Sequence, residues 1–180
     1  MIDVKKYISE GQDIFAILDG SEQESNFNIE KLVEDLIADY SNQTIQRHTV
    51  YIPSKGRASS HTTYNLCVEE QVPCRIVVEP QDYVEYVETI PHNHLLTLDK
   101  NDQGIQYART WIKNYSKSQG ESYHWQMDDD MKYFTMRMDD KNKRVNLLHS
   151  MSIIEQVFTI FENVAVGGMT SNAFAFSKPK

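Results

Sequence analysis

Three consecutive aspartates, Asp128, Asp129 and Asp130, are the residues whose type and spacing most directly suggest chemistry in this chain. An apolar stretch precedes them, so they would lie at the end of a β-strand, and in α/β sheets ligands collect at the carboxyl ends of the strands. Hard cations such as Mg²⁺ and Mn²⁺ prefer carboxylate oxygens, and they usually bind through one or two carboxylates plus substrate phosphates. The triplet therefore indicates a site for a divalent cation, and the alternative is a solvated acidic turn.

Polar residues also follow three other predicted strands, at the point where each strand ends. These segments are Pro53-Ser54-Lys55-Gly56-Arg57, Glu79-Pro80, and the stretch 99–104 with Asp99, Asn101 and Gly104. Because parallel strands end at one edge of a sheet, four segments distant in sequence would converge on one crevice.

Two arginines near these strand ends, Arg57 and Arg109, have forked donors suited to phosphate oxygens. A metal that bridges two phosphates between such arginines describes a nucleoside-diphosphate site. Plainer alternatives remain for each residue. Arg57 could be a surface charge that caps a helix, Arg109 could pair with an acid on its own helix, and Glu79 could be an ordinary turn residue.

The order of the predicted elements explains how these ends would meet. Residues 49–52, closed by Pro53, then 75–78, 94–98 and 123–127 read as strands, and 60–71, 81–89 and 104–117 read as helices. This alternation predicts an α/β fold with a mostly parallel sheet and helices on both faces. A hairpin of 132–138 with 145–149 around 139–142, a helix over 153–164 and a strand over 173–176 would follow.

The first 48 residues read as a separate extension before a domain over 49–180. Residues 13–18 could form a short strand, and 29–40 carry the apolar spacing of an amphipathic helix, with Asn28 as its N-cap. This helix could pack on the main domain. The alternative is that it docks a protein partner or a second copy of the chain.

Composition excludes several classes of protein. With a net charge of −8 the chain is not one that holds nucleic acid mainly by neutralising the backbone. No apolar run approaches the roughly 20 residues that a membrane span needs, and the N-terminus lacks the apolar core of a secretory signal. The two cysteines, Cys67 and Cys74, match no zinc-ligand spacing and read as core residues. A cytoplasmic location is expected.

Four segments in order resemble the GT-A class of nucleotide-sugar glycosyltransferases: 51–57, the strand that ends in Glu79, the helix start 104–109, and 128–130. Two sequence motifs resemble those of the phage TET/JBP-associated glycosyltransferases: Ile-Pro-Ser-Lys-Gly-Arg at 52–57 and His-Trp-Gln-Met-Asp-Asp-Asp at 124–130. The resemblance covers about residues 49–164. It implies a GT-A-like, mostly parallel Rossmann-like sheet with flanking helices, here behind an N-terminal helical extension.

The resemblance also implies an activity: metal-dependent transfer of a sugar from a nucleotide sugar, of the UDP-glucose type, to a hydroxymethylated pyrimidine in phage DNA. Mn²⁺ or Mg²⁺ would assist. The donor-binding residues that it implies are Pro53, Ser54 and Arg57 at the nucleoside end, Glu79 near the base or ribose, Gly104 and Arg109 near the phosphates or sugar, and Asp128 and Asp129. Asp128 and Asp130 would be the metal ligands.

One departure from the GT-A pattern concerns the acceptor half. Only 50 residues follow Asp130, with His149 as their sole histidine, whereas GT-A enzymes are usually longer there. No catalytic residue is predicted, and a truncated enzyme or half of a larger assembly is an alternative. A non-catalytic binding protein with the nucleotide-sugar fold is another. A third is a glycosyltransferase or nucleotidyltransferase with a different acceptor.

Overall fold

The computed structural model describes residues 48–138, 141–160 and 165–169. The strand and the helix predicted before residue 48, and the strand predicted over 173–176, lie outside these residues. The described residues divide into two compact units, one that ends at Phe134 and one that begins at Thr135, and each is described by itself. The proposed domain boundary near residue 48 stays a prediction.

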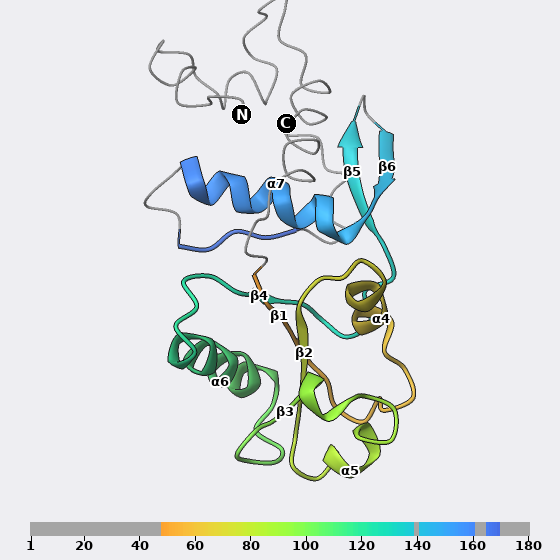
Figure 1. The fold of residues 1–180 in the computed structure, drawn as a ribbon, viewed down its shortest axis with the longest axis vertical. Helices are drawn as coiled ribbons and strands as arrows, with labels where there is room; N and C mark the ends of the chain where they lie inside the picture. The colour runs from red at the N-terminus through yellow and green to blue at the C-terminus, as the bar shows by residue number, and fades with distance from the viewer. Residues whose placement is uncertain (1–47, 139–140, 161–164, 170–180) are drawn as a thin grey trace, which may run out of the picture. The chain divides into compact units, whose positions relative to one another are not determined.

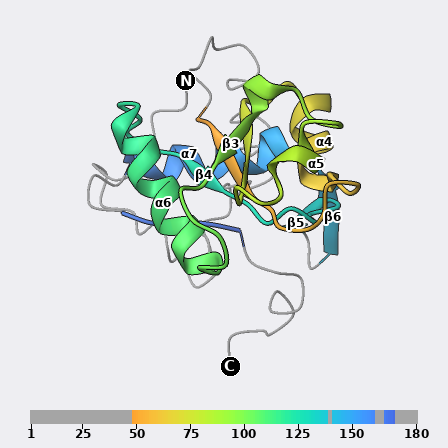
Figure 2. The same cartoon turned by 90° about the horizontal axis from the view of Figure 1, so that it is seen from below.

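The first unit contains a four-stranded parallel sheet, as the sequence predicts. Its strands are β1 (Val50–Pro53), β2 (Cys74–Val78), β3 (Leu95–Thr97) and β4 (Trp125–Gln126), in the spatial order β3-β2-β1-β4. The helices are α4 (Thr62–Glu69), α5 (Tyr83–Tyr86) and α6 (Ile105–Ser118), with a 3₁₀ turn, η1, at His92–His94. Helix α6 covers one face of the sheet and α4 the other (Figures 1 and 2). This is the predicted α/β, GT-A-like class of fold.

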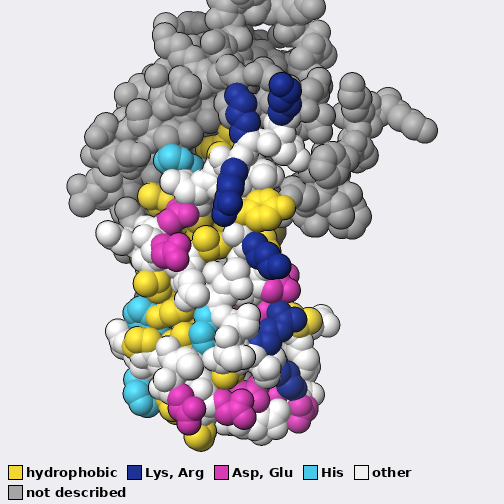
Figure 3. All heavy atoms as spheres, turned by 90° about the vertical axis from the view of Figure 1, so that its right-hand side faces the viewer, with side chains coloured by type: hydrophobic (Ala, Val, Ile, Leu, Met, Phe, Trp, Pro, Cys, Tyr) yellow, Lys and Arg dark blue, Asp and Glu magenta, His cyan; other side chains and the backbone are white. Residues whose placement is uncertain are grey.

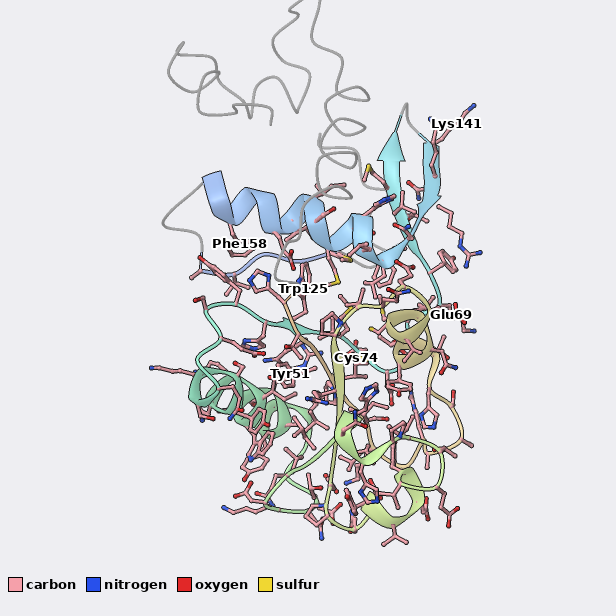
Figure 4. The ribbon with its side chains drawn as sticks, in the orientation of Figure 1. Tyr51, Glu69, Cys74, Trp125, Lys141 and Phe158 are labelled. Atoms are coloured by element: carbon pink, nitrogen blue, oxygen red, sulfur yellow. The ribbon has the colours of Figure 1, made fainter. Side chains whose placement is uncertain are left out.

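The two central strands are apolar on both faces because helices cover both. Tyr51 and Val77 face α6 and share a core with Leu98, Ala108 and Ile112. Cys74 pairs with Val50, the residue before Tyr51, so its side chain points to the opposite face of the sheet. That face is the α4 side (Figure 4). Cys67 and Cys74 are both buried free thiols, in keeping with their prediction as core residues.

Helix α6 begins directly after Gly104, whose φ of 80° lies in the left-handed region that favours glycine. Its buried residues, Ala108, Ile112 and Ser116, recur every fourth position and form the face that packs on the sheet. Arg109 follows Ala108 and is therefore directed away from that buried face. The glycine thus fixes where the helix starts, and with it the position of Arg109 at the start of the second turn.

Two predicted strands are shorter in the structure. Of residues 123–127, only Trp125–Gln126 form β4, because the ladder begins where the Trp125 amide donates to the Thr49 carbonyl, at 2.9 Å. His94 belongs to the turn η1 rather than to a strand, so β3 begins at Leu95.

In the second unit the hairpin has a different second strand from the one predicted. Strand β5 (Phe134–Met138) pairs with β6 (Lys141–Val145), and helix α7 (Leu147–Ile160) follows at once. The prediction of a strand over 145–149 is wrong, because the Asn146 side chain accepts a hydrogen bond from the His149 amide, at 3.1 Å, and caps a helix there. The predicted helix over 153–164 therefore starts earlier, at Leu147, and its last four residues lie outside the described part.

Candidate active site

The carboxyl ends of β1 and β4 meet where the order of the sheet reverses. The chain runs from β1 outward to β2 and β3, and then returns along the other face through α6 to pair β4 with β1. Such a topological switch point is where open α/β sheets bind their ligands. The loop after β1 carries Ser54 and Arg57, and the loop after β4 carries the aspartate triplet. The structure therefore brings these two predicted segments together.

Asp129 is the inward-facing member of the triplet. Its side chain is only 14% exposed. Ser54 Oγ donates to its Oδ2 at 2.5 Å, and Arg57 Nη1 donates to its Oδ1 at 2.7 Å. Both carboxylate oxygens are thus held by residues of the β1 loop, so Asp129 joins the two loops.

Asp128 and Asp130 point outward, with side chains 60% and 64% exposed. Arg109 Nη2 lies 2.7 Å from Asp128 Oδ1, and Arg57 Nη1 lies 3.3 Å from Asp130 Oδ2. Hydrogen bonding to Asp130, and then the charge of Asp129, raise the pKa of Arg57. Three carboxylates are therefore partly neutralised by two guanidinium groups.

The backbone of the triplet is held by Thr63, in the first turn of α4, which the sequence analysis did not single out. Its buried hydroxyl donates to the Asp128 carbonyl at 2.6 Å and accepts from the Met131 amide at 2.9 Å. Its own amide donates to the Asp129 carbonyl at 3.3 Å. One helix start thus satisfies three backbone groups of the acidic loop and fixes which of its side chains point outward.

A second cluster joins the ends of β1, β2 and β3. Lys55 Nζ lies 2.9 Å from Glu79 Oε2 and 2.5 Å from Asp102 Oδ1, and Gln81 Nε2 donates to the same Glu79 oxygen at 2.7 Å. Burial, the largest single effect, would raise the pKa of Glu79, which is 5% exposed, but the hydrogen bond from Lys55, a hydrogen bond from the Asp102 backbone and the charge of Lys55 together outweigh it, and the pKa is lowered. The hydrogen bonds to Asp102 and Glu79 raise the pKa of Lys55. All three groups are therefore ionised at neutral pH.

The other predicted site residues differ in accessibility. Pro53 and Ser54 are buried at the end of β1, and Glu79 bonds within the second cluster rather than to the triplet. Gly104 is exposed, and a Cβ atom added there would meet no atom within 4 Å. Acidic side chains, with lysine and arginine beside them, gather at the lower end of this unit in Figure 3.

The donor set fits a hard cation that shares its coordination with a ligand. Within the part of the chain that the structure describes, no group of three or more His, Cys, Asp or Glu side chains could hold a metal by itself. The two outward carboxylates, Asp128 and Asp130, suit instead an ion that takes one or two protein carboxylates and completes its shell with phosphate oxygens.

Comparisons with known proteins identify a family for this chain. A family model described as TET-Associated Glycosyltransferase matches residues 48–180. A search of curated proteins and a search of solved structures each found no match. In the described ranges, the helices are too short or too polar to cross a membrane.

Proposed function

Since the chain belongs to the TET-associated glycosyltransferase family and is a glycosyltransferase, we propose that it moves a sugar from a UDP-type nucleotide sugar to a hydroxymethylated pyrimidine in phage DNA. The observation that carries the donor part is the pair of outward carboxylates, Asp128 and Asp130, flanked by the guanidinium groups of Arg57 and Arg109 at the switch point of the sheet. Carboxylates for a cation, next to forked donors for phosphate oxygens, are what a diphosphate needs.

In this proposal each site residue has a role that its position supports. Asp128 and Asp130 would hold Mn²⁺ or Mg²⁺, which would supply positive charge to neutralise the diphosphate. Arg109, at the start of the second turn of α6, contacts the phosphates or the sugar, and the exposed Gly104 lets the donor approach the backbone before that helix. Pro53, Ser54 and Arg57 form the wall at the nucleoside end, where Asp129 holds Ser54 and Arg57 in place.

The second cluster supports the role of Glu79 near the base or ribose. Lys55 Nζ and Gln81 Nε2 both bond to Glu79 Oε2 and to Asp102 Oδ1, so exposed residues hold the buried Glu79 at the strand ends. A uracil or ribose bound beside this cluster would meet Lys55, whose third N–H can donate to a carbonyl or hydroxyl oxygen.

DNA as the acceptor is supported by a short run of cations. The chain carries −8 overall, yet four residues of β6 in sequence, Lys141 to Arg144, are exposed and three of them are basic. Such side chains could contact phosphates, although too few are present for tight binding to plain duplex. The target base would have to be flipped out or presented single-stranded, at a cost of about a few kcal/mol.

A transfer assay tests this function directly. Wild-type protein is incubated with Mn²⁺, with each of a panel of nucleotide sugars, and with DNA that contains either ordinary or hydroxymethylated pyrimidines. We expect release of uridine diphosphate and formation of glycosylated DNA only when a uridine-based donor and modified DNA are both present. Transfer to a small molecule or to a protein, with none to modified DNA, would overturn the acceptor while leaving the family and its donor site unaffected.

The basic strand gives a separate prediction. Changing Lys143 and Arg144 together to Ala should lower transfer to hydroxymethylated DNA and reduce the slope of log affinity against log salt by about two, because roughly one counterion is released per phosphate contact. Donor affinity should not change. The matched control is Lys113→Ala with Lys117→Ala, which removes two exposed cations from α6. Equal loss in both double variants would show that net charge, not β6, governs DNA binding.

A further inference from the structure

Tyr86, the last residue of the short helix α5, has a fully buried side chain whose hydroxyl lies at the candidate active site. Its oxygen is 2.7 Å from Ser54 Oγ and 3.0 Å from the backbone nitrogen of Arg57. A tyrosine with this burial normally finds a partner for its hydroxyl. Here both partners belong to the β1 loop that holds Asp129.

The direction of every hydrogen bond in this group follows from counting protons. The Asp129 carboxylate beside Arg57 can only accept, so the single hydroxyl hydrogen of Ser54 goes to Asp129 Oδ2. The Arg57 amide can only donate, so the Tyr86 oxygen accepts from it. The one remaining arrangement has the Tyr86 hydroxyl donating to Ser54 Oγ.

The bonds therefore form a closed ring that starts and ends at Arg57. Its backbone amide donates to Tyr86, Tyr86 donates to Ser54, Ser54 donates to Asp129, and Asp129 accepts from the Arg57 side chain. The ring joins α5 to the loops after β1 and β4. It holds Asp129 inward and so leaves Asp128 and Asp130 as the exposed carboxylates.

We propose that Tyr86 is a positioning residue of the donor site, whose hydroxyl fixes Ser54, Arg57 and Asp129 in the arrangement that receives the nucleotide sugar. This inference rests on the proposed function for the identity of the ligand. The ring itself consists of protein groups alone and does not depend on which ligand binds. Tyr86 acts through its neighbours and is not expected to touch the reacting atoms.

The test compares Tyr86→Phe with Tyr64→Phe. Tyr64, on α4, is also buried, and its hydroxyl bonds to His94 Nδ1 at 2.7 Å instead of to a residue of the ring. Each variant keeps the aromatic ring and loses one hydroxyl, so similar changes in melting temperature are expected. Only Tyr86→Phe should raise the donor KM, by roughly tenfold, because an unpaired polar group is left in the site. Its Arg57 amide should also exchange with solvent faster.

A second variant makes the test independent of how Tyr86→Phe folds. Ser54→Ala breaks the same ring at its next member, so the double variant should lose little more than the worse single variant. Additive losses, or a donor KM and an Arg57 exchange rate in Tyr86→Phe equal to those of Tyr64→Phe, would overturn the role of Tyr86 alone. Wild-type protein that binds no nucleotide sugar would overturn the proposed donor site, and the role of Tyr86 with it.

Discussion

Changing Asp130 to Ala is expected to abolish the effect of Mn²⁺ or Mg²⁺ on the binding of uridine diphosphate. Asp130 is one of only two triplet carboxylates that point outward, with a side chain 64% exposed, so its loss leaves Asp128 as the one outward ligand. Even the removal of a group that merely orients a metal ligand costs roughly 10- to 100-fold in metal affinity. Titration calorimetry with uridine diphosphate, in the presence of the metal or of a chelator, measures the effect.

Two controls sharpen this result. Glu88→Gln removes an exposed carboxylate that follows α5, so it changes the net charge by the same amount without altering the triplet. Asp129→Asn should act differently from Asp130→Ala, because it weakens the bonds to Ser54 and Arg57 and should lower the melting temperature. Equal affinity of the wild type for uridine diphosphate with metal and with chelator would show that the metal assignment is wrong.

Much of the fold could be predicted because its signals are local. The continuous β-branched run of β2 reads as a strand buried on both faces, and the spacing of Ile105, Ala108, Ile112 and Tyr115 reads as a helix. The hairpin boundary failed for an equally local reason. Val145 to His149 look apolar enough for a strand, but Asn146 before two leucines is an N-cap signal that outweighs that pattern.

The site was predicted less completely, because its contacts join residues far apart in the chain. The triplet and the arginines stand out by charge, and their segments do converge. Which aspartate points inward depends on Ser54 and Thr63, which lie more than sixty residues earlier. In the sequence, Tyr86 is one of several large residues of the helix predicted over 81–89. Its burial requires a partner, but nothing in the sequence says that the partner is Ser54.

The other large effect is expected on changing Arg109, because this residue contacts a predicted metal ligand and is also proposed to contact the donor. Its guanidinium lies 2.7 Å from the Asp128 carboxylate, where a cation would also bind. Removal of the guanidinium by Arg109→Ala should therefore change two affinities in opposite directions. Affinity for Mn²⁺ alone should rise, by no more than about fivefold because the pair is half exposed. Affinity for uridine diphosphate at saturating Mn²⁺ should fall by roughly 10- to 100-fold, because charge-assisted bonds to phosphate are lost.

Arg109→Lys separates the charge of the side chain from its shape. Lysine keeps a cation near Asp128, so the affinity for Mn²⁺ alone should stay near that of the wild type. It lacks the planar fork that contacts two phosphate oxygens at once, so it should not restore the affinity for uridine diphosphate. Calorimetry of both ligands on the three proteins gives the full comparison. If Arg109→Ala moves both affinities in the same direction, or if lysine restores diphosphate binding, Arg109 is only a surface partner of Asp128 and the donor phosphates bind elsewhere.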